Sequence, residues 1–215
     1  LKEAGYEIEA QSNKGYHIVS APDVMDEAEL NSIRKTNWAG CEIQYFDQID
    51  STNTKAKELA EENGYTFVHP FDDDDVITGQ GTITMEIIQE LPTVDYIFAP
   101  VGGGGLISGV AALAKMLNPK IQVIGVEPIE AASMSASLEA GEVVTLESAN
   151  TIADGTAVKT VGDKALKYAK EYVDMMLTVE DDELIGAFLD MVENHKMIVE
   201  NSGLLTVAAL KQIDL

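Results

Sequence analysis

Residues 94–126 decide the fold class, and they read VDYIFAPVGGGGLISGVAALAKMLNPKIQVIGV. Val94–Val101 and Ile121–Val126 are apolar and partly β-branched, as is typical of buried strands. Between them, Leu106–Leu117 has the apolar spacing of a helix, which ends before Pro119. A strand, a helix and a second strand in this order predict a βαβ unit whose two strands are adjacent and parallel.

More helices are predicted on both sides of this unit. They are expected at Gln80–Glu90, Ala131–Ala140, Asp163–Tyr172, Asp181–Glu193 and Gly203–Leu210, with a short strand at Met176–Val179. Helices alternating with buried strands predict an α/β fold, a doubly wound and mostly parallel sheet with helices on both faces. The acidic run Asp72–Asp75 is interpreted as a solvated loop.

The first fifty residues have a different pattern. Tyr6–Ala10 and Tyr16–Ser20 alternate polar and apolar residues around a polar turn, which predicts a β-hairpin. A short helix is expected at about Asp26–Lys35 and a further strand at Glu42–Ile49. This part therefore predicts a small α+β unit.

A junction helix separates the two patterns. Asp50–Asn53 offers N-capping side chains, and Gly64 offers a C-terminal stop. The predicted organisation is an N-terminal fragment at residues 1–53, the junction helix at 54–64 and a larger α/β unit at 65–215.

The composition excludes several classes of protein. Fourteen basic and 37 acidic residues give a net charge of −23, which would repel nucleic acid. A hydrophobic content of 46% is enough for a core. A single cysteine, Cys41, excludes an internal disulfide framework. No apolar stretch is long enough for a membrane span and no secretory signal is evident, so a cytoplasmic location is expected. The chain opens on Leu1, which suggests a fragment.

Four consecutive glycines, Gly102–Gly105, stand between a predicted buried strand and a predicted helix. Glycine lets the backbone turn its N–H groups inward and lets a ligand approach closely. The N-terminus of the following helix adds unpaired donors and a positive dipole end. The loop is therefore interpreted as a phosphate cradle, with a ligand-free connector as the alternative.

The residues that follow the four glycines indicate which kind of phosphate compound the loop could bind. A P-loop needs a Gly-Lys-Ser/Thr sequence, and no lysine follows here. The dinucleotide fingerprint fails at its third glycine, which is Ile107 or Ser108. Glu127 does stand where a ribose-binding acid would, so a dinucleotide-binding α/β protein remains an alternative. The loop fits the single phosphate group of a small cofactor better than it fits a dinucleotide.

Several motifs, in order, resemble the threonine dehydratase (threonine ammonia-lyase) and serine racemase family. They are Gly79–Thr82, Pro100–Leu106, Gly125–Pro128, Thr151–Gly155 and Glu200–Gly203. The resemblance runs from about Lys55 to the end. It implies an incomplete large domain of the tryptophan-synthase-β type, with pyridoxal 5′-phosphate as cofactor. The implied reaction converts threonine to 2-oxobutanoate and ammonia, with threonine or serine as substrate and a homo-oligomer as the possible assembly.

The resemblance also implies roles for individual residues. The cofactor-binding residues would be Gly102, Gly103, Gly104, Gly105, Leu106, Gly155 and Glu200. The glycine loop would hold the phosphate, Gly155 would lie against the pyridine ring, and Glu200 would lie close to it. Glu127 and Ala131 would help to bind a monovalent or divalent cation, although the third ligand position is Ser133 instead of an acid.

The catalytic lysine of that family has no counterpart here. It would form a Schiff base with the cofactor and serve as general base, and it belongs to a Ser-Phe-Lys-like motif that this sequence lacks. The Ser-x-Gly-Asn-His segment that grips the substrate is absent as well. No catalytic residue is therefore identified, and the chain alone is expected to be inactive.

The N-terminal fifty-odd residues resemble the biotin–protein ligase and biotin-operon repressor family. The likeness rests on Gly5–Glu9, Lys14–Tyr16 and Tyr45–Ala56. It implies that the hairpin is the wing of a winged helix and that Ser51–Asn53 matches the biotin-contacting motif, with a plain helix cap as the alternative. The adenylate loop of that family is absent. The two resemblances together predict a hybrid chain, and a biotin- or partner-binding module is the alternative function.

Overall fold

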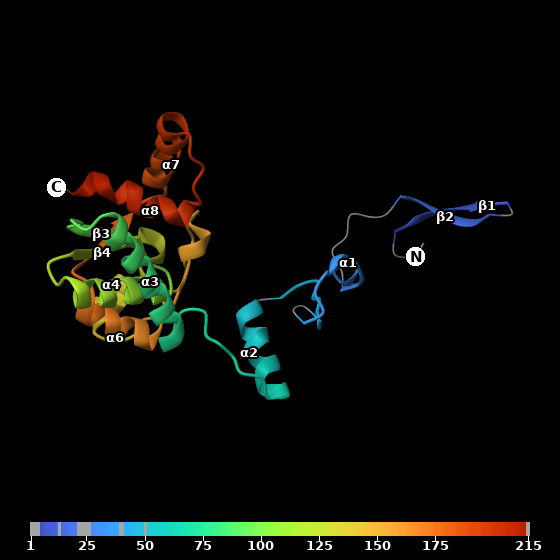
Figure 1. The fold of residues 1–215 in the computed structure, drawn as a ribbon, viewed down its shortest axis with the longest axis horizontal. Coiled ribbons are helices and arrows are strands. Elements are labelled where there is room, and N and C mark those ends of the chain that lie inside the picture. The colour runs from blue at the N-terminus through green and yellow to red at the C-terminus, as the bar shows by residue number, and fades with distance from the viewer. Residues whose placement is uncertain (1–4, 13, 21–26, 39–40, 50, 214–215) are drawn as a thin grey trace. The chain divides into compact units, whose positions relative to one another are not determined.

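The computed structural model describes residues 5–12, 14–20, 27–38, 41–49 and 51–213. The chain divides into two compact units, with the boundary between Phe67 and Val68 (Figure 1). This boundary lies close to the predicted change of pattern, and the assignment of the units to separate domains stays a prediction.

A three-stranded parallel sheet forms the centre of the second unit. Its order is β3 (Tyr96–Pro100), β4 (Gln122–Pro128) and β5 (Met175–Val179). Ala99 pairs with Gly125, which in turn pairs with Met176. The predicted adjacency of the two strands around the glycine loop is confirmed, and so is the parallel sheet.

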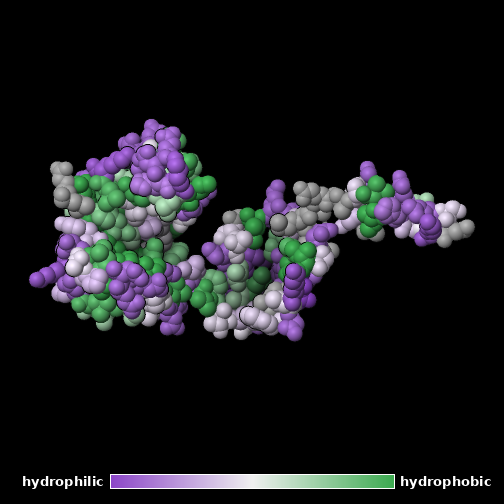
Figure 2. Space-filling view, turned by 45° about the horizontal axis from the view of Figure 1, so that its top comes forward, coloured by the Kyte–Doolittle hydropathy of each residue, from purple (hydrophilic) through white to green (hydrophobic). Residues whose placement is uncertain are grey.

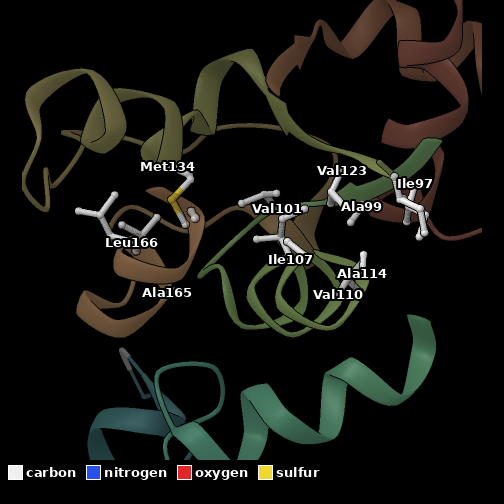
Figure 3. Close-up of a cluster of buried hydrophobic side chains, with 14 of the residues drawn as sticks. Ile97, Ala99, Val101, Ile107, Val110, Ala114, Val123, Met134, Ala165 and Leu166 are labelled. Atoms are coloured by element: carbon white, nitrogen blue, oxygen red, sulfur yellow. The ribbon is translucent and has the colours of Figure 1, made fainter. Parts of the chain in front are cut away.

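One face of the sheet is covered by a layer of helices around α4 (Gly105–Leu117). Helices α3 (Asp74–Glu90) and α6 (Asp163–Tyr172) pack against α4, and α5 (Ser133–Ala140) packs against α6. Figure 3 shows buried side chains that this layer shares with the sheet, among them the fully buried Ile107.

The other face of the sheet is covered by α8 (Asn201–Ala209), and α7 (Asp181–Asp190) packs against α8. Leu204 and Leu205 are fully buried in the cluster of side chains that these helices share with the sheet. The shorter turns are η1 (Ile129–Ala131), η2 (Asp154–Thr156), η3 (Met191–His195) and η4 (Leu210–Gln212). The predicted α/β fold with a parallel sheet and helices on both faces is confirmed. The doubly wound order stays a prediction, because the described strands follow one another in the order β3-β4-β5 without a reversal. No helix among the described residues is long and apolar enough to cross a membrane.

Two predictions in this unit were wrong in detail. The acidic run is not a solvated loop, because Asp73 is the N-cap of α3 and accepts the N–H groups of Asp75 at 2.9 Å and Val76 at 3.2 Å. Helix α3 therefore begins six residues before the predicted start at Gln80. The predicted helix at Asp181–Glu193 changes to a π-helical turn at Met191, and Lys196 ends that turn with a φ of 58°.

The described part of the first unit contains a hairpin and two helices. Strands β1 (Glu7–Gln11) and β2 (Gly15–Ser20) are antiparallel, as predicted. Helix α1 spans Glu27–Ile33, and α2 spans Thr52–Asn63. Ser51 caps α2 by accepting the Thr54 N–H at 3.2 Å, and Gly64 ends it with a φ of 69°. Both cap assignments are confirmed; Asp50 lies outside the described residues.

This unit has little buried surface. Among its described residues only Ala60 is buried, while Tyr16 and Trp38 are both 83% exposed. Figure 2 shows hydrophobic residues on its visible surface. The strand expected at Glu42–Ile49 is absent and this stretch is irregular, because the sheet in the described part of the unit holds only β1 and β2. The hairpin therefore gains no support as the wing of a winged helix.

We expect limited proteolysis to cut the first unit well before the second. A segment with so few buried side chains opens at little cost in free energy, whereas the second unit has two apolar clusters. Mass spectrometry of a time course should show early cuts within residues 5–67 and a persistent fragment that begins near Val68. Equal protection of both units would contradict this expectation.

Candidate cofactor site

The glycine loop lies at the carboxyl end of β3, where ligands of open α/β sheets bind. Gly104 is the N-cap of α4, with a φ of 96°. The Ser108 N–H donates to Gly104 O at 3.1 Å. The N–H groups of Gly105, Leu106 and Ile107 therefore have no acceptor inside the helix, and they stand at the positive end of its dipole. This arrangement can bind an anion.

The loop needs glycine for reasons of space as well as of conformation. A Cβ atom on Gly103 would overlap the Phe71 ring, and one on Gly105 would lie 2.7 Å from Phe71 O. A Cβ atom on Gly104 would lie 2.6 Å from the Met134 Cε atom and 2.7 Å from the Ala165 Cβ atom. The loop is therefore closely packed against Phe71, Met134 and Ala165.

A cavity of about 450 Å³ opens on this loop. It brings together all the residues that the sequence analysis named as cofactor-binding: Gly102, Gly103, Gly104, Gly105, Leu106, Gly155 and Glu200. Their roles toward a cofactor stay predictions. The volume lies within the range of pockets for small ligands.

Another part of the cavity lining lies where η2 meets the start of α8. A Cβ atom on Gly155 would lie 3.0 Å from Ser202 Oγ and 3.5 Å from Glu200 Oε1. The Asn201 amide donates to Ile152 O at 2.8 Å, which ties α8 to the segment before η2. Glycine at 155 therefore keeps this wall flat beside the Glu200 carboxylate.

The cavity lining carries little charge. Glu200 is the only ionisable residue that lines it within the described part of the chain. Lys159, which follows Gly155 in sequence, donates instead to Glu147 O at 3.0 Å, and Lys164 pairs with Asp74 at 2.6 Å. A bound phosphate would thus be held by backbone N–H groups and the helix dipole.

Sequence reasoning gave no cofactor-binding role to several other residues that line the cavity, among them Gln80, Ser202 and Phe71. Gln80 and Ser202 lie within motifs that carry the resemblance, so a signal for them was present. Phe71 stands in a segment that carries no recognised motif, and its contact with Gly103 depends on tertiary structure.

Glu127 is fully buried at the end of β4 and caps the N-terminus of α5. Its Oε1 accepts the Met134 N–H at 2.7 Å. Its Oε2 accepts the N–H of Ser135 at 2.9 Å and the hydroxyl of Ser135 at 2.6 Å. Burial raises the pKa of this carboxyl, and the hydrogen bonds oppose that rise.

These contacts do not fit the cation suggested for Glu127 and Ala131. Both carboxylate oxygens are engaged, and the N-terminus of α5 already compensates the charge. Ser133 Oγ is buried without a hydrogen-bond partner, but the described residues contain no group of three or more His, Cys, Asp or Glu suited to a metal. The same engagement of Glu127 disfavours the dinucleotide alternative.

We expect Mg²⁺, Ca²⁺ and K⁺ at millimolar concentration to leave the melting temperature unchanged. Glu127→Gln should destabilise the protein by about 1–3 kcal/mol, because its amide N–H₂ would face backbone N–H groups without an acceptor. Thermal unfolding with and without each cation measures both effects. A rise in melting temperature with a cation that is lost in Glu127→Gln would restore the cation site.

Comparison with known proteins defines the class of the chain. The family model described as "Pyridoxal-phosphate dependent enzyme" (PALP) matches residues 14–215. The chain therefore belongs to this family of pyridoxal-phosphate dependent enzymes. The match begins inside the segment that resembles biotin–protein ligase, and the comparisons give that second resemblance no support.

Within the family the chain is similar to threonine dehydratases. The biosynthetic L-threonine dehydratase of Burkholderia multivorans is 41% identical over 196 residues, which are 90% of this chain and 39% of that protein. The L-threonine ammonia-lyase of Thermotoga maritima is 43% identical over 184 residues, which are 85% of this chain and 46% of that protein. The chain thus spans less than half the length of these curated relatives.

Solved structures show the same fold. The processed form of threonine deaminase isoform 2 from Solanum lycopersicum superimposes with a TM-score of 0.71 and 41% identity, over 75% of this chain and 49% of that chain. Maize serine racemase gives a TM-score of 0.71 and 38% identity, over 75% of this chain and 49% of that chain. The fold is that of the pyridoxal-phosphate enzymes of the tryptophan-synthase-β type.

Proposed function

We propose that this chain is the cofactor-holding portion of a threonine or serine dehydratase, whose reaction converts threonine to 2-oxobutanoate and ammonia. One observation carries the proposal: a single cavity joins a glycine cradle at a helix N-terminus to Gly155 and Glu200. The similarity to proteins named as threonine dehydratases and threonine ammonia-lyases supports the choice of substrate.

Each part of the cavity has a distinct task in this proposal. The N–H groups of the glycine loop and of Leu106 bind the phosphate, helped by the dipole of α4. Gly155 leaves room for the flat ring, and Glu200 places a carboxylate beside it. When bound, pyridoxal phosphate supplies the electron sink of the reaction.

The base that removes the substrate α-proton is not supplied by this cavity. Its lining contains no lysine among the described residues, and Lys159 and Lys164 are engaged elsewhere. We infer that the chain by itself binds the cofactor without turning over threonine.

We also propose that residues 1–53 and 65–215 are distinct domains joined by the helix at 54–64, in a hybrid chain. Ala60 is the only buried residue in the described part of this segment up to Phe67, which supports this division. The enzyme family model matches from residue 14 onward. The part of the chain outside the enzyme family is therefore shorter than the segment of residues 1–53 that the resemblance to biotin–protein ligase implies.

A titration tests the proposed binding function. Calorimetry of the purified chain should give saturable binding of pyridoxal 5′-phosphate, and inorganic phosphate should compete with it. Pyridoxal, which lacks the phosphate, should bind at least about tenfold more weakly, because hydrogen bonds to the anion are lost. Equal affinities for the two compounds would reject the glycine loop as the phosphate site.

A further inference from the structure

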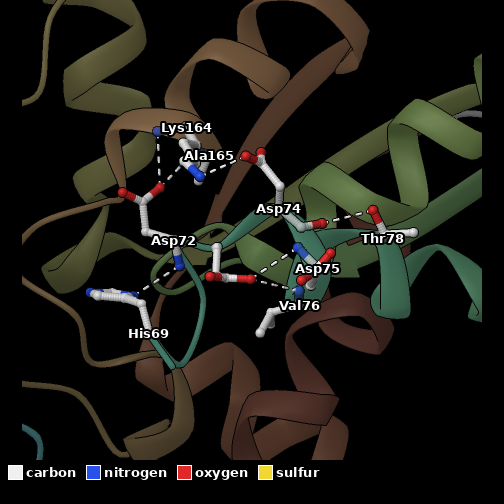
Figure 4. A network of polar contacts seen from close by, with 9 residues as sticks. His69, Asp72, Asp74, Asp75, Val76, Thr78, Lys164 and Ala165 are labelled. Carbon is white, nitrogen blue, oxygen red and sulfur yellow. Dashed lines mark hydrogen bonds and ion pairs between the residues drawn. The ribbon is translucent and has the colours of Figure 1, made fainter. Parts of the chain in front are cut away.

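Helix α6 begins without a capping side chain of its own. Its N-cap is Gly162, and the acceptor comes instead from Asp72, which precedes α3. Asp72 Oδ1 accepts the N–H groups of Lys164 at 2.9 Å and Ala165 at 3.2 Å (Figure 4). A Cβ atom on Gly162 would overlap this carboxylate, so glycine there leaves room for it. Asp72 is therefore the cap of a helix far away in sequence.

The capped end of α6 lies directly against the glycine loop. The Gly162 N–H donates to Gly103 O at 3.1 Å. The space that a Cβ atom on Gly104 would need is filled by Ala165. The Ser108 hydroxyl, which donates to Gly104 O at 2.6 Å, also lies 3.3 Å from Ala165 O. A shift of the first turn of α6 would thus move the loop and the start of α4 with it.

The turn that carries Asp72 also packs against the loop. The Phe71 ring fills the space next to Gly103, and Phe71 O lies next to Gly105. His69 Nδ1 accepts the Asp72 N–H at 2.9 Å. The His69 and Phe71 rings pack edge to face, with their centroids 4.6 Å apart. The turn and the end of α6 that it caps therefore both contact the glycine loop.

We propose that Asp72 is a positioning residue for phosphate binding: by capping α6 it holds the glycine loop in its anion-binding conformation. This proposal rests on the proposed function of the loop. Asp72 is not among the residues that line the cavity, so it acts through α6. The direction of the change in affinity distinguishes two roles for Asp72. If its carboxylate acted only through its negative charge, it would weaken anion binding, and replacing it by alanine would strengthen that binding.

Asp73 provides a matched control. It also caps a helix with one carboxylate oxygen, which accepts the Asp75 and Val76 N–H groups of α3. Asp72→Ala and Asp73→Ala each remove one negative charge and one helix cap. We expect Asp72→Ala to weaken the affinity for pyridoxal 5′-phosphate roughly tenfold, which corresponds to the free energy that one helix cap contributes. Asp73→Ala should change this affinity by less than about twofold.

Asp72→Asn keeps the acceptor oxygen and removes the charge. Its affinity for pyridoxal 5′-phosphate should equal or exceed that of the wild type. Tighter binding by Asp72→Ala, or equal weakening by Asp72→Ala and Asp73→Ala at equal loss of stability, would overturn the positioning role.

Hydrogen exchange without any ligand gives a second readout. The amides of Ser108 and Gly162, which donate to Gly104 O and Gly103 O, should exchange faster in Asp72→Ala than in the wild type, while Asp73→Ala leaves them unchanged. Unchanged exchange in Asp72→Ala would overturn the proposal. If the wild type binds neither pyridoxal 5′-phosphate nor inorganic phosphate, the proposed function fails, and the exchange result still decides whether Asp72 holds the loop.

Discussion

The purified chain, saturated with pyridoxal 5′-phosphate, should release 2-oxobutanoate and ammonia from threonine no faster than the free cofactor does. The cavity offers Glu200 as its only ionisable lining residue in the described structure, and it lacks a lysine. General base assistance alone contributes about 10²–10⁴-fold to a rate, and substrate orientation contributes further. Detection of 2-oxobutanoate against a cofactor-only blank measures the effect.

Trapping with borohydride provides the control for this prediction. Peptide mapping after reduction should label no single lysine of the chain, and exposed ones such as Lys159 should react weakly and without preference. Turnover well above the blank, together with one specifically labelled lysine, would show that the chain carries a nucleophile of its own.

Replacement of Gly104 by valine should abolish most of the affinity for pyridoxal 5′-phosphate. Gly104 has a φ of 96°, which a β-branched residue rarely adopts, and a Cβ atom there would lie 2.6 Å from Met134 Cε. The loop would have to move, and its hydrogen bonds to a charged group would be lost, at a cost of at least about 1–3 kcal/mol. Calorimetric titration of the variant measures this loss.

Gly141→Val is the matched control for the glycine loop. Gly141 also has a positive φ, of 77°, but a Cβ atom there would meet nothing within 4 Å. It ends α5 and is not among the residues that line the cavity. This variant should lose stability yet keep its affinity for the cofactor. Unchanged affinity in Gly104→Val would mean that the loop is only a connector.

The features that sequence reasoning found are local ones. Residues 94–126 contain both strands, the helix and the loop between them, so their spacing alone predicts the parallel pair. The hairpin and the caps of α2 are equally local, because Ser51 and Gly64 act on neighbouring residues.

The features that sequence reasoning missed depend on distant partners. Glu42–Ile49 has the composition of a strand, but no described strand pairs with it. Asp72 belongs to an acidic run that is typical of a solvated loop, and only the fold brings it to the end of α6. A glutamate such as Glu127 at the end of a buried strand indicates that its carboxylate has a binding partner. The sequence does not identify that partner, because a cation, a ribose hydroxyl or a helix N-terminus can each bind a carboxylate, and here it is a helix N-terminus.

The backbone amides of the glycine loop can be followed by NMR as pyridoxal 5′-phosphate is added. If this loop holds the phosphate, the N–H signals of Gly102–Leu106 shift most, since hydrogen bonds to a phosphate form there, and pyridoxal leaves them nearly unchanged. Shifts of equal size with both compounds, or shifts confined to residues away from this loop, would contradict this role of the loop.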